Sequence, residues 1–189
     1  TATIGQSVSY TLTPATGYKV SKITVNGTSV SVTNSGATAT YTLTMTAEDT
    51  TISVTFAKKT YAVSVGDVTN GTVTLSSTGN ISYNTTITVT ATPDTGYELD
   101  QILVNGTAIS GTTFKVTKAS TVTATFKKIQ CAVSVGTVSN GKVTISPTGT
   151  VDYGTTITVT ATPATGYKLN QILVNGTAIE GTTFTVTEA

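Results

Sequence analysis

The sequence predicts an all-β protein built from tandem, small β-rich modules of about 70 residues. Threonine, a β-branched residue that favours half-buried strands, makes up about a quarter of the chain. Asn-Gly pairs, which favour tight hairpin turns, separate segments in which apolar residues alternate with threonines. The stretch TGYELDQILVNGTAI at 95–109 recurs almost unchanged at 165–179 and more loosely at 16–30. Such repetition indicates a modular array.

The internal repeat divides the chain into three copies. Aligning residues 61–119 with residues 131–189 matches 43 of 59 positions without a gap. The first copy carries nine extra residues between Asn26 and Phe56, and we expect a longer hairpin there because loop-closure entropy grows slowly with length. The predicted repeats are 1–58 (N-terminally incomplete, with the longer hairpin), 59–128 (complete) and 129–189 (C-terminally incomplete).

The middle copy gives the expected order of strands, each bounded by turn residues. The strands are expected at residues 61–65, 72–75, 86–92, 97–104, 113–117 and 121–126. In the third of these, Ile87 and Val89 alternate with threonines, which is the period of a half-buried strand. The PDTG segment at 93–96 predicts a turn, and Asn105-Gly106 predicts a two-residue type I′ hairpin.

A change of phase predicts a β-bulge in the strand at 97–104. Tyr97 and Leu99 share one face, whereas Ile102 and Val104 have the opposite parity. One extra residue near 100–101 returns all four apolar side chains to the same face. A strand buried on both sides is the alternative interpretation.

Two further predictions concern positions that recur in every copy. The tyrosine after each TG pair persists while its neighbours change charge, so we expect a core position for Tyr18, Tyr97 and Tyr167. Glycine and asparagine tolerate positive φ, so we expect left-handed backbone at the equivalent positions Gly5, Asn84 and Gly154.

The junctions between copies are expected to be semi-rigid. Modules of this size bury modest cores, so contacts between neighbouring copies are expected to contribute to stability. The junction segments AKKTY at 57–61 and KKIQC at 127–131 are short and lack Gly, Pro and Ser. They favour an elongated array over modules joined by flexible linkers.

The pattern YAVSV…NGTVT…TTITVTATPDTGYELDQILVNGT…TFKVTKASTVTATF resembles the divergent internalin B-repeat-like domains, which belong with the Listeria–Bacteroides repeats of bacterial surface proteins. The resemblance covers essentially the whole chain, and TATPxTGY…VNG is its most specific part. It implies small β-rich modules in an extracellular, secreted or cell-wall attached protein. We expect each module to be β-grasp-like or a small sandwich. Such modules usually act as spacers or accessory domains, and the family has no defined catalytic motif to transfer.

Charge and rare residue types argue against several classes of function. Charged residues make up 10% of the chain and the net charge is +1, which argues against a nucleic-acid partner and a polybasic membrane-surface segment. No apolar stretch is long enough to span a bilayer, and no signal peptide is visible in a chain that opens mid-pattern. Histidine is absent and cysteine occurs once. We therefore expect no enzyme activity, no cofactor and no metal site.

An acidic cluster of the middle copy is not repeated in the third copy. Asp94, Glu98 and Asp100 form the cluster. The equivalent residues of the third copy are Ala164, Lys168 and Asn170. Because one carboxylate is replaced by a lysine, a solvated face is favoured over a cation site.

Three other candidate sites have simpler explanations. Cys131 has no histidine to activate it, so a buried or edge-strand position is favoured over a reactive thiol beside Gln130. An isopeptide bond is disfavoured because tandem junction lysines are expected to face solvent: Lys58, Lys59, Lys127 and Lys128. The hairpin turn alone accounts for the glycosylation-like NGT motifs at Asn26, Asn105 and Asn175.

Carbohydrate binding is the strongest competing function, because sugar-binding β-modules stack rings on exposed aromatic side chains. Tyr83 and Tyr153 are the recurring candidates for such a surface. Two hypotheses therefore stay open. The first is a non-catalytic extracellular spacer, stalk or adhesive surface module; the second is a carbohydrate- or protein-binding module accessory to a secreted enzyme or adhesin. The partner in either case is a host or cell-surface protein or a glycan that the sequence does not identify.

Overall fold

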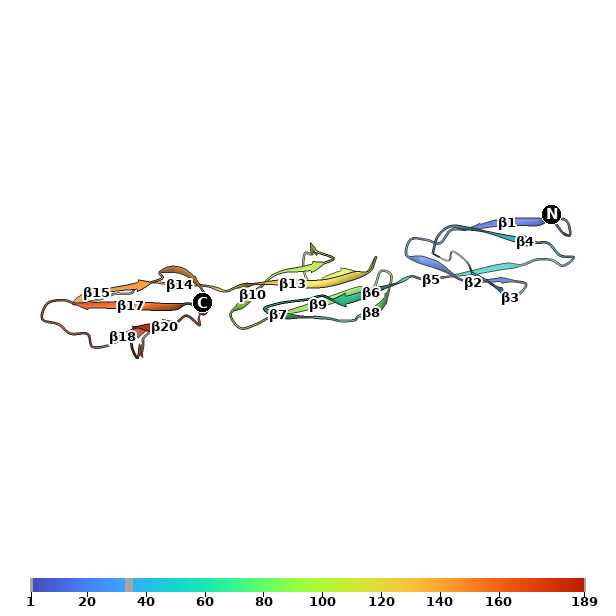
Figure 1. Cartoon of the computed structure of the whole chain (residues 1–189). Coiled ribbons are helices and arrows are strands. Elements are labelled where there is room, and N and C mark those ends of the chain that lie inside the picture. The colour runs from blue at the N-terminus through green and yellow to red at the C-terminus, as the bar shows by residue number, and fades with distance from the viewer. Residues whose placement is uncertain (1, 33–35, 189) are drawn as a thin grey trace. The chain divides into compact units, whose positions relative to one another are not determined.

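A computed structural model describes residues 2–32 and 36–188, and every regular element in these ranges is a strand (Figure 1). The chain divides into two compact units. The first comprises Thr1–Gly66, Thr74–Thr90 and Leu103–Thr123, and the second comprises Asp67–Val73, Ala91–Ile102 and Ala124–Ala189. The middle repeat contributes to both units. The described residues contain no helix that is long and apolar enough to cross a membrane.

The first repeat consists of a two-stranded and a three-stranded sheet. Strands β1 (Ser7–Leu12) and β4 (Ala39–Thr44) form the first, and β3 (Thr28–Val30), β2 (Tyr18–Val25) and β5 (Ile52–Lys58) form the second in that order. The register of β2 against β5 shifts between Val20 and Lys22, and both Val20 and Ile23 are buried. The sequence has the same change of phase between Val20 and Ile23, so a bulge of the predicted kind is confirmed in this repeat, whereas the bulge near residues 100–101 stays a prediction.

The middle repeat folds as two sheets around one core. The five-stranded sheet has the order β11 (Thr107–Ala108), β10 (Tyr97–Val104), β13 (Ser120–Lys128), β6 (Thr60–Val65) and β8 (Gly79–Ser82). The three-stranded sheet has the order β12 (Thr113–Lys115), β9 (Thr86–Pro93) and β7 (Gly71–Leu75). Val63 and Ile81 of the larger sheet pack with Ile87 of the smaller sheet and with Val116. Of the two expected architectures, this arrangement corresponds to the small sandwich.

The third repeat reproduces the pairing of the first strands of this layout. Strands β14 (Gln130–Val133) and β16 (Gly149–Asp152) pair as β6 and β8 do, and β15 (Gly141–Ser146), β17 (Thr156–Pro163) and β20 (Thr183–Thr185) form the smaller sheet. Strands β18 (Ile172–Val174) and β19 (Thr177–Ile179) form a separate hairpin. The core contains Cys131, Val151, Ile157 and Val186. Within the described residues, no strand joins the β14–β16 pair to the β18–β19 pair.

The predicted left-handed positions are confirmed. The φ angles are 81° at Gly5, 63° at Asn84 and 84° at Gly154. Asn105 and Gly106 both have positive φ, 51° and 77°, as a type I′ turn requires. Part of the nine-residue insertion of the first repeat, residues 33–35, lies outside the described residues.

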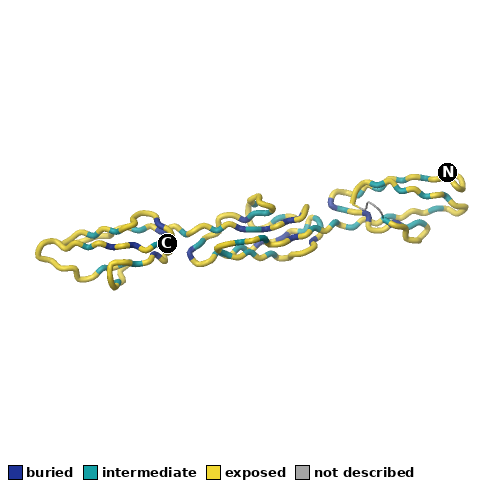
Figure 2. The backbone as a smooth tube through the Cα atoms, in the orientation of Figure 1, coloured by how far each residue is buried: buried dark blue, intermediate teal, exposed yellow. Residues whose placement is uncertain are grey.

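Burial is confined to short patches within each repeat (Figure 2). The expectation that the tyrosine after each TG pair lies in the core is wrong for Tyr167, which is 58% exposed, while Tyr18 and Tyr97 are only half-buried. Tyr18 and Tyr97 begin strands that lie beside β5 and β13, whereas Tyr167 is in no strand. The alternation of side chains between the two faces of a strand therefore does not determine how deeply this tyrosine is buried.

Candidate functional site: the junctions between repeats

A single residue links each repeat to the next. Strand β5 ends at Lys58 and β6 begins at Thr60, so Lys59 is the whole linker between the first and second repeats. Strand β13 ends at Lys128 and β14 begins at Gln130, which leaves Ile129 in the equivalent position. Linkers this short restrict the conformations available to the chain between two folded modules.

Each linker residue is hydrogen-bonded to both of its neighbouring repeats. The backbone N–H of Lys59 donates to the carbonyl oxygen of Gly17 at 2.8 Å, and its own carbonyl accepts the N–H of Tyr83 at 2.8 Å. At the second junction, Ile129 N–H donates to Gly96 at 2.9 Å and its carbonyl accepts from Tyr153 at 2.9 Å. The same pair of bonds therefore occurs at both junctions.

The tyrosine of each junction also packs on the glycine of the preceding repeat. Gly17 and Gly96 are buried and have φ of 79° and 84°. A β-carbon built on Gly96 would lie 2.5 Å from Cδ1 of Tyr153, and one built on Gly17 would overlap the ring of Tyr83. Only glycine provides both the left-handed conformation and the space for the ring. We call the glycine, the linker residue and the tyrosine together the junction clasp.

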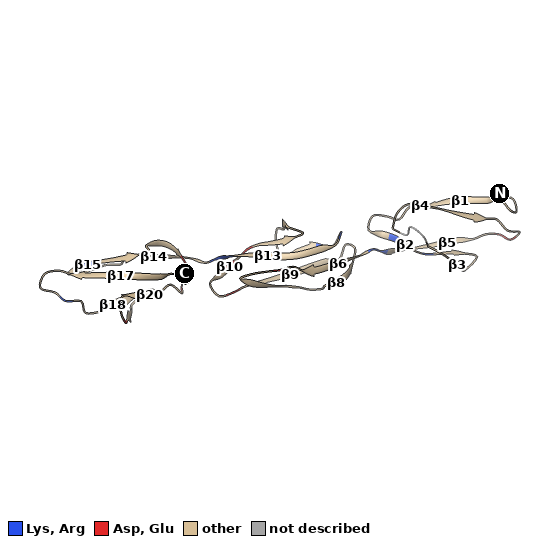
Figure 3. Cartoon of the chain, viewed as in Figure 1, with Lys and Arg blue, Asp and Glu red and all other residues tan. Residues whose placement is uncertain are grey.

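Charges around the second junction are exposed. Lys128 lies 3.9 Å from Asp152, and the side-chain amide of Gln130 donates to the same carboxylate at 2.6 Å. Both partners of the ion pair are about half exposed, so its contribution to stability is small. Charged residues are sparse over the whole chain (Figure 3).

The carboxylates of the acidic cluster contact strand β13. Glu98 forms an ion pair with Lys127 at 3.3 Å, and Asp100 accepts a hydrogen bond from the hydroxyl of Thr125 at 2.9 Å. Asp94 forms no side-chain hydrogen bond or ion pair with either of them within the described residues, which also contain no group of three or more His, Cys, Asp or Glu suited to hold a metal ion. These two carboxylates therefore help to hold β13 against β10.

The other candidate residues lie in a core, at a junction between repeats or on the surface. Cys131 is 1% exposed in the apolar core of the third repeat. Tyr83 and Tyr153, the candidates for a sugar-stacking surface, are half-buried at the junctions. The ammonium of Lys59 donates to the carbonyl of Gly36 at 2.8 Å, and the Lys127 side chain is 60% exposed.

The asparagine of the VNG turn has a role that sequence reasoning missed. Besides adopting positive φ, Asn105 accepts the N–H of Thr121 at 2.9 Å and donates its side-chain amide to the carbonyl of Ala119 at 3.0 Å. In the first repeat, Asn26 accepts the N–H of Thr51 at 2.7 Å. The side chain thus fixes the start of the strand that completes each of these repeats. The recurrence of Asn, where glycine would also turn the chain, was the available signal.

Comparison with known protein families matches the chain to one model three times in tandem. The divergent InlB B-repeat domain matches residues 1–60, 61–130 and 131–189. Searches of curated proteins and of solved structures gave no match.

Proposed function

Because the chain belongs to the divergent InlB B-repeat family, we propose that it is a non-catalytic, extracellular spacer segment of a bacterial surface or secreted protein. Tandem repeats of this family are typical of bacterial surface proteins. A spacer has to restrict the orientation of neighbouring modules. It also has to expose few chemically reactive side chains.

The junction clasp is the observation that supports this proposal. A one-residue linker with two backbone hydrogen bonds, together with an aromatic ring on a buried glycine, occurs at both junctions. Each hydrogen bond contributes about 0.5–1.5 kcal/mol, and a half-buried aromatic ring adds apolar contact. Recurrence at equivalent positions is expected of a structural connection, because every junction of an array has to meet the same requirement.

An absence of catalysis is part of the proposal. The chain has no histidine, its cysteine is in a core, and Glu98 and Asp100 contact residues of β13. None of these groups has the arrangement of a nucleophile with an adjacent base.

The proposal is tested by measuring how the second and third repeats reorient in solution. Residual dipolar couplings of the full chain are expected to fit one alignment tensor for both repeats. In Tyr153→Ala the repeats are expected to need separate tensors, whereas in Tyr167→Ala, which removes an exposed ring outside the junctions, they keep one. Independent tensors in the unaltered chain would contradict the spacer proposal.

The elongated array expected from the sequence stays a prediction. A compact chain of this length has a radius of gyration of about 16 Å, and small-angle scattering from a stiff spacer is expected to give a clearly larger value. The alternative function, a carbohydrate- or protein-binding module, predicts instead saturable binding on a glycan array or to a surface protein. Loss of that binding in Tyr83→Ala or Tyr153→Ala, with the fold intact, would favour the alternative.

A further inference from the structure

The two strands through which the chain enters and leaves the middle repeat are neighbours in its larger sheet (Figure 1). Strand β6 begins directly after the linker residue Lys59, and β13 ends directly before the linker residue Ile129. In the order β10–β13–β6–β8, each of these two strands has a further strand on its other side. The strands that carry the chain into and out of this repeat are therefore both inner strands of the sheet.

Strands β6 and β13 pair in parallel. Ser120 pairs with Val63 and Val122 pairs with Val65, and the N–H of Gly66 donates to the carbonyl of Val122 at 2.8 Å. In a parallel pair, the start of one strand and the end of the other lie at opposite ends of the pair. Tension applied to the chain on both sides of the repeat therefore pulls β6 and β13 in opposite directions along their length. The bonds between the two strands then share the tension, because none of them can break first without the others being strained.

The paired residues are shielded from solvent. Val63 is 1% exposed, Ser120 is 6% exposed and Val122 is 0% exposed. Val63 also packs with Ile81 and Ile87 in the core of the repeat. Hydrogen bonds are stronger in such a low-dielectric environment. Burial also keeps solvent water from replacing a bond between the strands as that bond lengthens.

Strand β13 is held on its other side as well, by side chains of β10 and of the turn that follows it. The side chain of Asn105 accepts the N–H of Thr121 and donates to the carbonyl of Ala119. Further along β13, the hydroxyl of Thr125 donates to the carboxylate of Asp100 at 2.9 Å. Movement of β13 along its own axis therefore has to break these bonds in addition to those with β6.

We propose that the middle repeat bears tension along the chain, and that the parallel pair of β6 and β13 is the element that resists it. This inference rests on the proposed spacer function, because a pull on a surface protein passes through the segment that connects its other parts. It adds a resistance that depends on direction: high when the repeat is pulled through its two ends, and low when the same pair is opened from one end. The equilibrium free energy of unfolding does not determine this resistance, because forced unfolding is governed by the rate of unfolding.

The test pulls single molecules of the full chain in two directions. In the first, the chain is held at its two termini, which pulls β6 and β13 past each other. In the second, it is held at the N-terminus and at a cysteine introduced by Lys118→Cys, an exposed position just before β13, which opens the pair from one end. Cys131 is 1% exposed and does not compete for the attachment. The paired residues share the tension only in the first direction, so the rupture force is expected to be about two- to threefold higher there.

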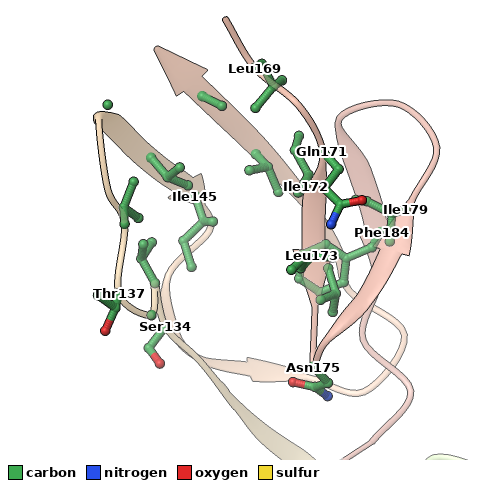
Figure 4. Close-up of a pocket in the computed structure, with 18 of the residues that line it drawn as sticks. Ser134, Thr137, Ile145, Leu169, Gln171, Ile172, Leu173, Asn175, Ile179 and Phe184 are labelled. Atoms are coloured by element: carbon green, nitrogen blue, oxygen red, sulfur yellow. The ribbon is translucent and has the colours of Figure 1, made fainter. Parts of the chain in front are cut away.

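Two observations assign the rupture event to the middle repeat. Its gain in length is at most about 240 Å when the chain from Thr60 to Lys128 becomes extended. The ring of Phe184 packs against the core of the third repeat and lines the pocket there, as does Ile145 (Figure 4). Phe184→Leu is therefore expected to change the rupture of the third repeat and to leave that of the middle repeat unaltered.

A matched pair of variants tests the contribution of the turn side chain. Asn105→Gly removes the two side-chain bonds to the start of β13 and is expected to lower the rupture force between the termini. Asn70→Gly is the control, because Asn70 also has positive φ, 64°, but forms no side-chain hydrogen bond within the part of the chain that the structure describes. It is expected to leave the rupture force unchanged.

Equal rupture forces in the two directions would overturn the proposal. So would a rupture force between the termini that Asn105→Gly and Asn70→Gly change to the same extent. Failure of the spacer proposal gives a different result. Independent alignment tensors in the unaltered chain, together with a rupture force that depends on direction, would contradict the spacer proposal alone.

Discussion

The ring of Tyr153 covers Gly96, a residue 57 positions earlier in the chain, so closely that a β-carbon on the glycine would be 2.5 Å from the ring. Tyr83 has the same relation to Gly17. Tyr153 also packs against the core of its own repeat, and each tyrosine covers the turn glycine of the repeat before it. The contact therefore links the stability of adjacent repeats.

Gly96→Ala is expected to destabilise the junction more than Gly166→Ala. The two glycines have φ of 84° and 85°, but no atom lies within 4 Å of a β-carbon built on Gly166. Both substitutions cost about 1–2 kcal/mol from the left-handed conformation, and Gly96→Ala adds about 1–3 kcal/mol because the Tyr153 ring has to move. Urea denaturation followed by NMR signals of each repeat measures both. Equal losses would show that the ring accommodates a methyl group.

Asn105→Gly is expected to destabilise the start of β13. Glycine accepts positive φ at this turn, so the substitution removes only the side chain. Asn105 loses its bonds to Thr121 and Ala119, worth about 1–2 kcal/mol together. Hydrogen exchange at the Thr121 amide reports the loss directly. An unchanged exchange rate there would contradict a fixing role for the side chain.

Tyr97→Ala is expected to cost about 2 kcal/mol, and Tyr167→Ala less than about 0.5 kcal/mol. The two tyrosines occupy identical TGY motifs, but Tyr97 is half-buried at the start of β10 and Tyr167 is 58% exposed. The free energy of unfolding of each variant from urea denaturation tests this difference. A large loss in Tyr167→Ala would mean that the ring is buried in solution.

The local features of the fold could be predicted from the sequence because they depend on neighbouring residues. Alternation with threonine predicted that Ile87 and Val89 face the core, and both are at most 2% exposed. The change of phase predicted the bulge that the first repeat has between Val20 and Lys22. Left-handed backbone followed from the interchange of Gly and Asn at one position, Asn84 in the middle repeat.

The junction clasp could not be predicted because its partners are distant in sequence. The alternation of strand faces predicted that Tyr97 lies in the core, and Tyr83 was a candidate for an exposed surface. Both residues are half-buried. The burial of Tyr83 depends on Gly17 of the preceding repeat, and that of Tyr97 depends on a strand about 25 residues later. Alignment of repeats identifies equivalent positions but does not show which of them touch.

Cys131 is expected to react with a thiol reagent only when the third repeat opens. Its side chain is 1% exposed and packs with Val151, Ile157 and Val186, so no reagent reaches the sulfur in the folded state. The labelling rate therefore measures the free energy of local opening. Val151→Ala, which removes two core methyl groups, is expected to weaken the repeat by about 1–3 kcal/mol and so to accelerate labelling about five- to hundredfold. Leu173→Asp, at an exposed position, is expected to leave the rate unchanged. Labelling of the unaltered chain as fast as a free thiol would contradict the burial of Cys131.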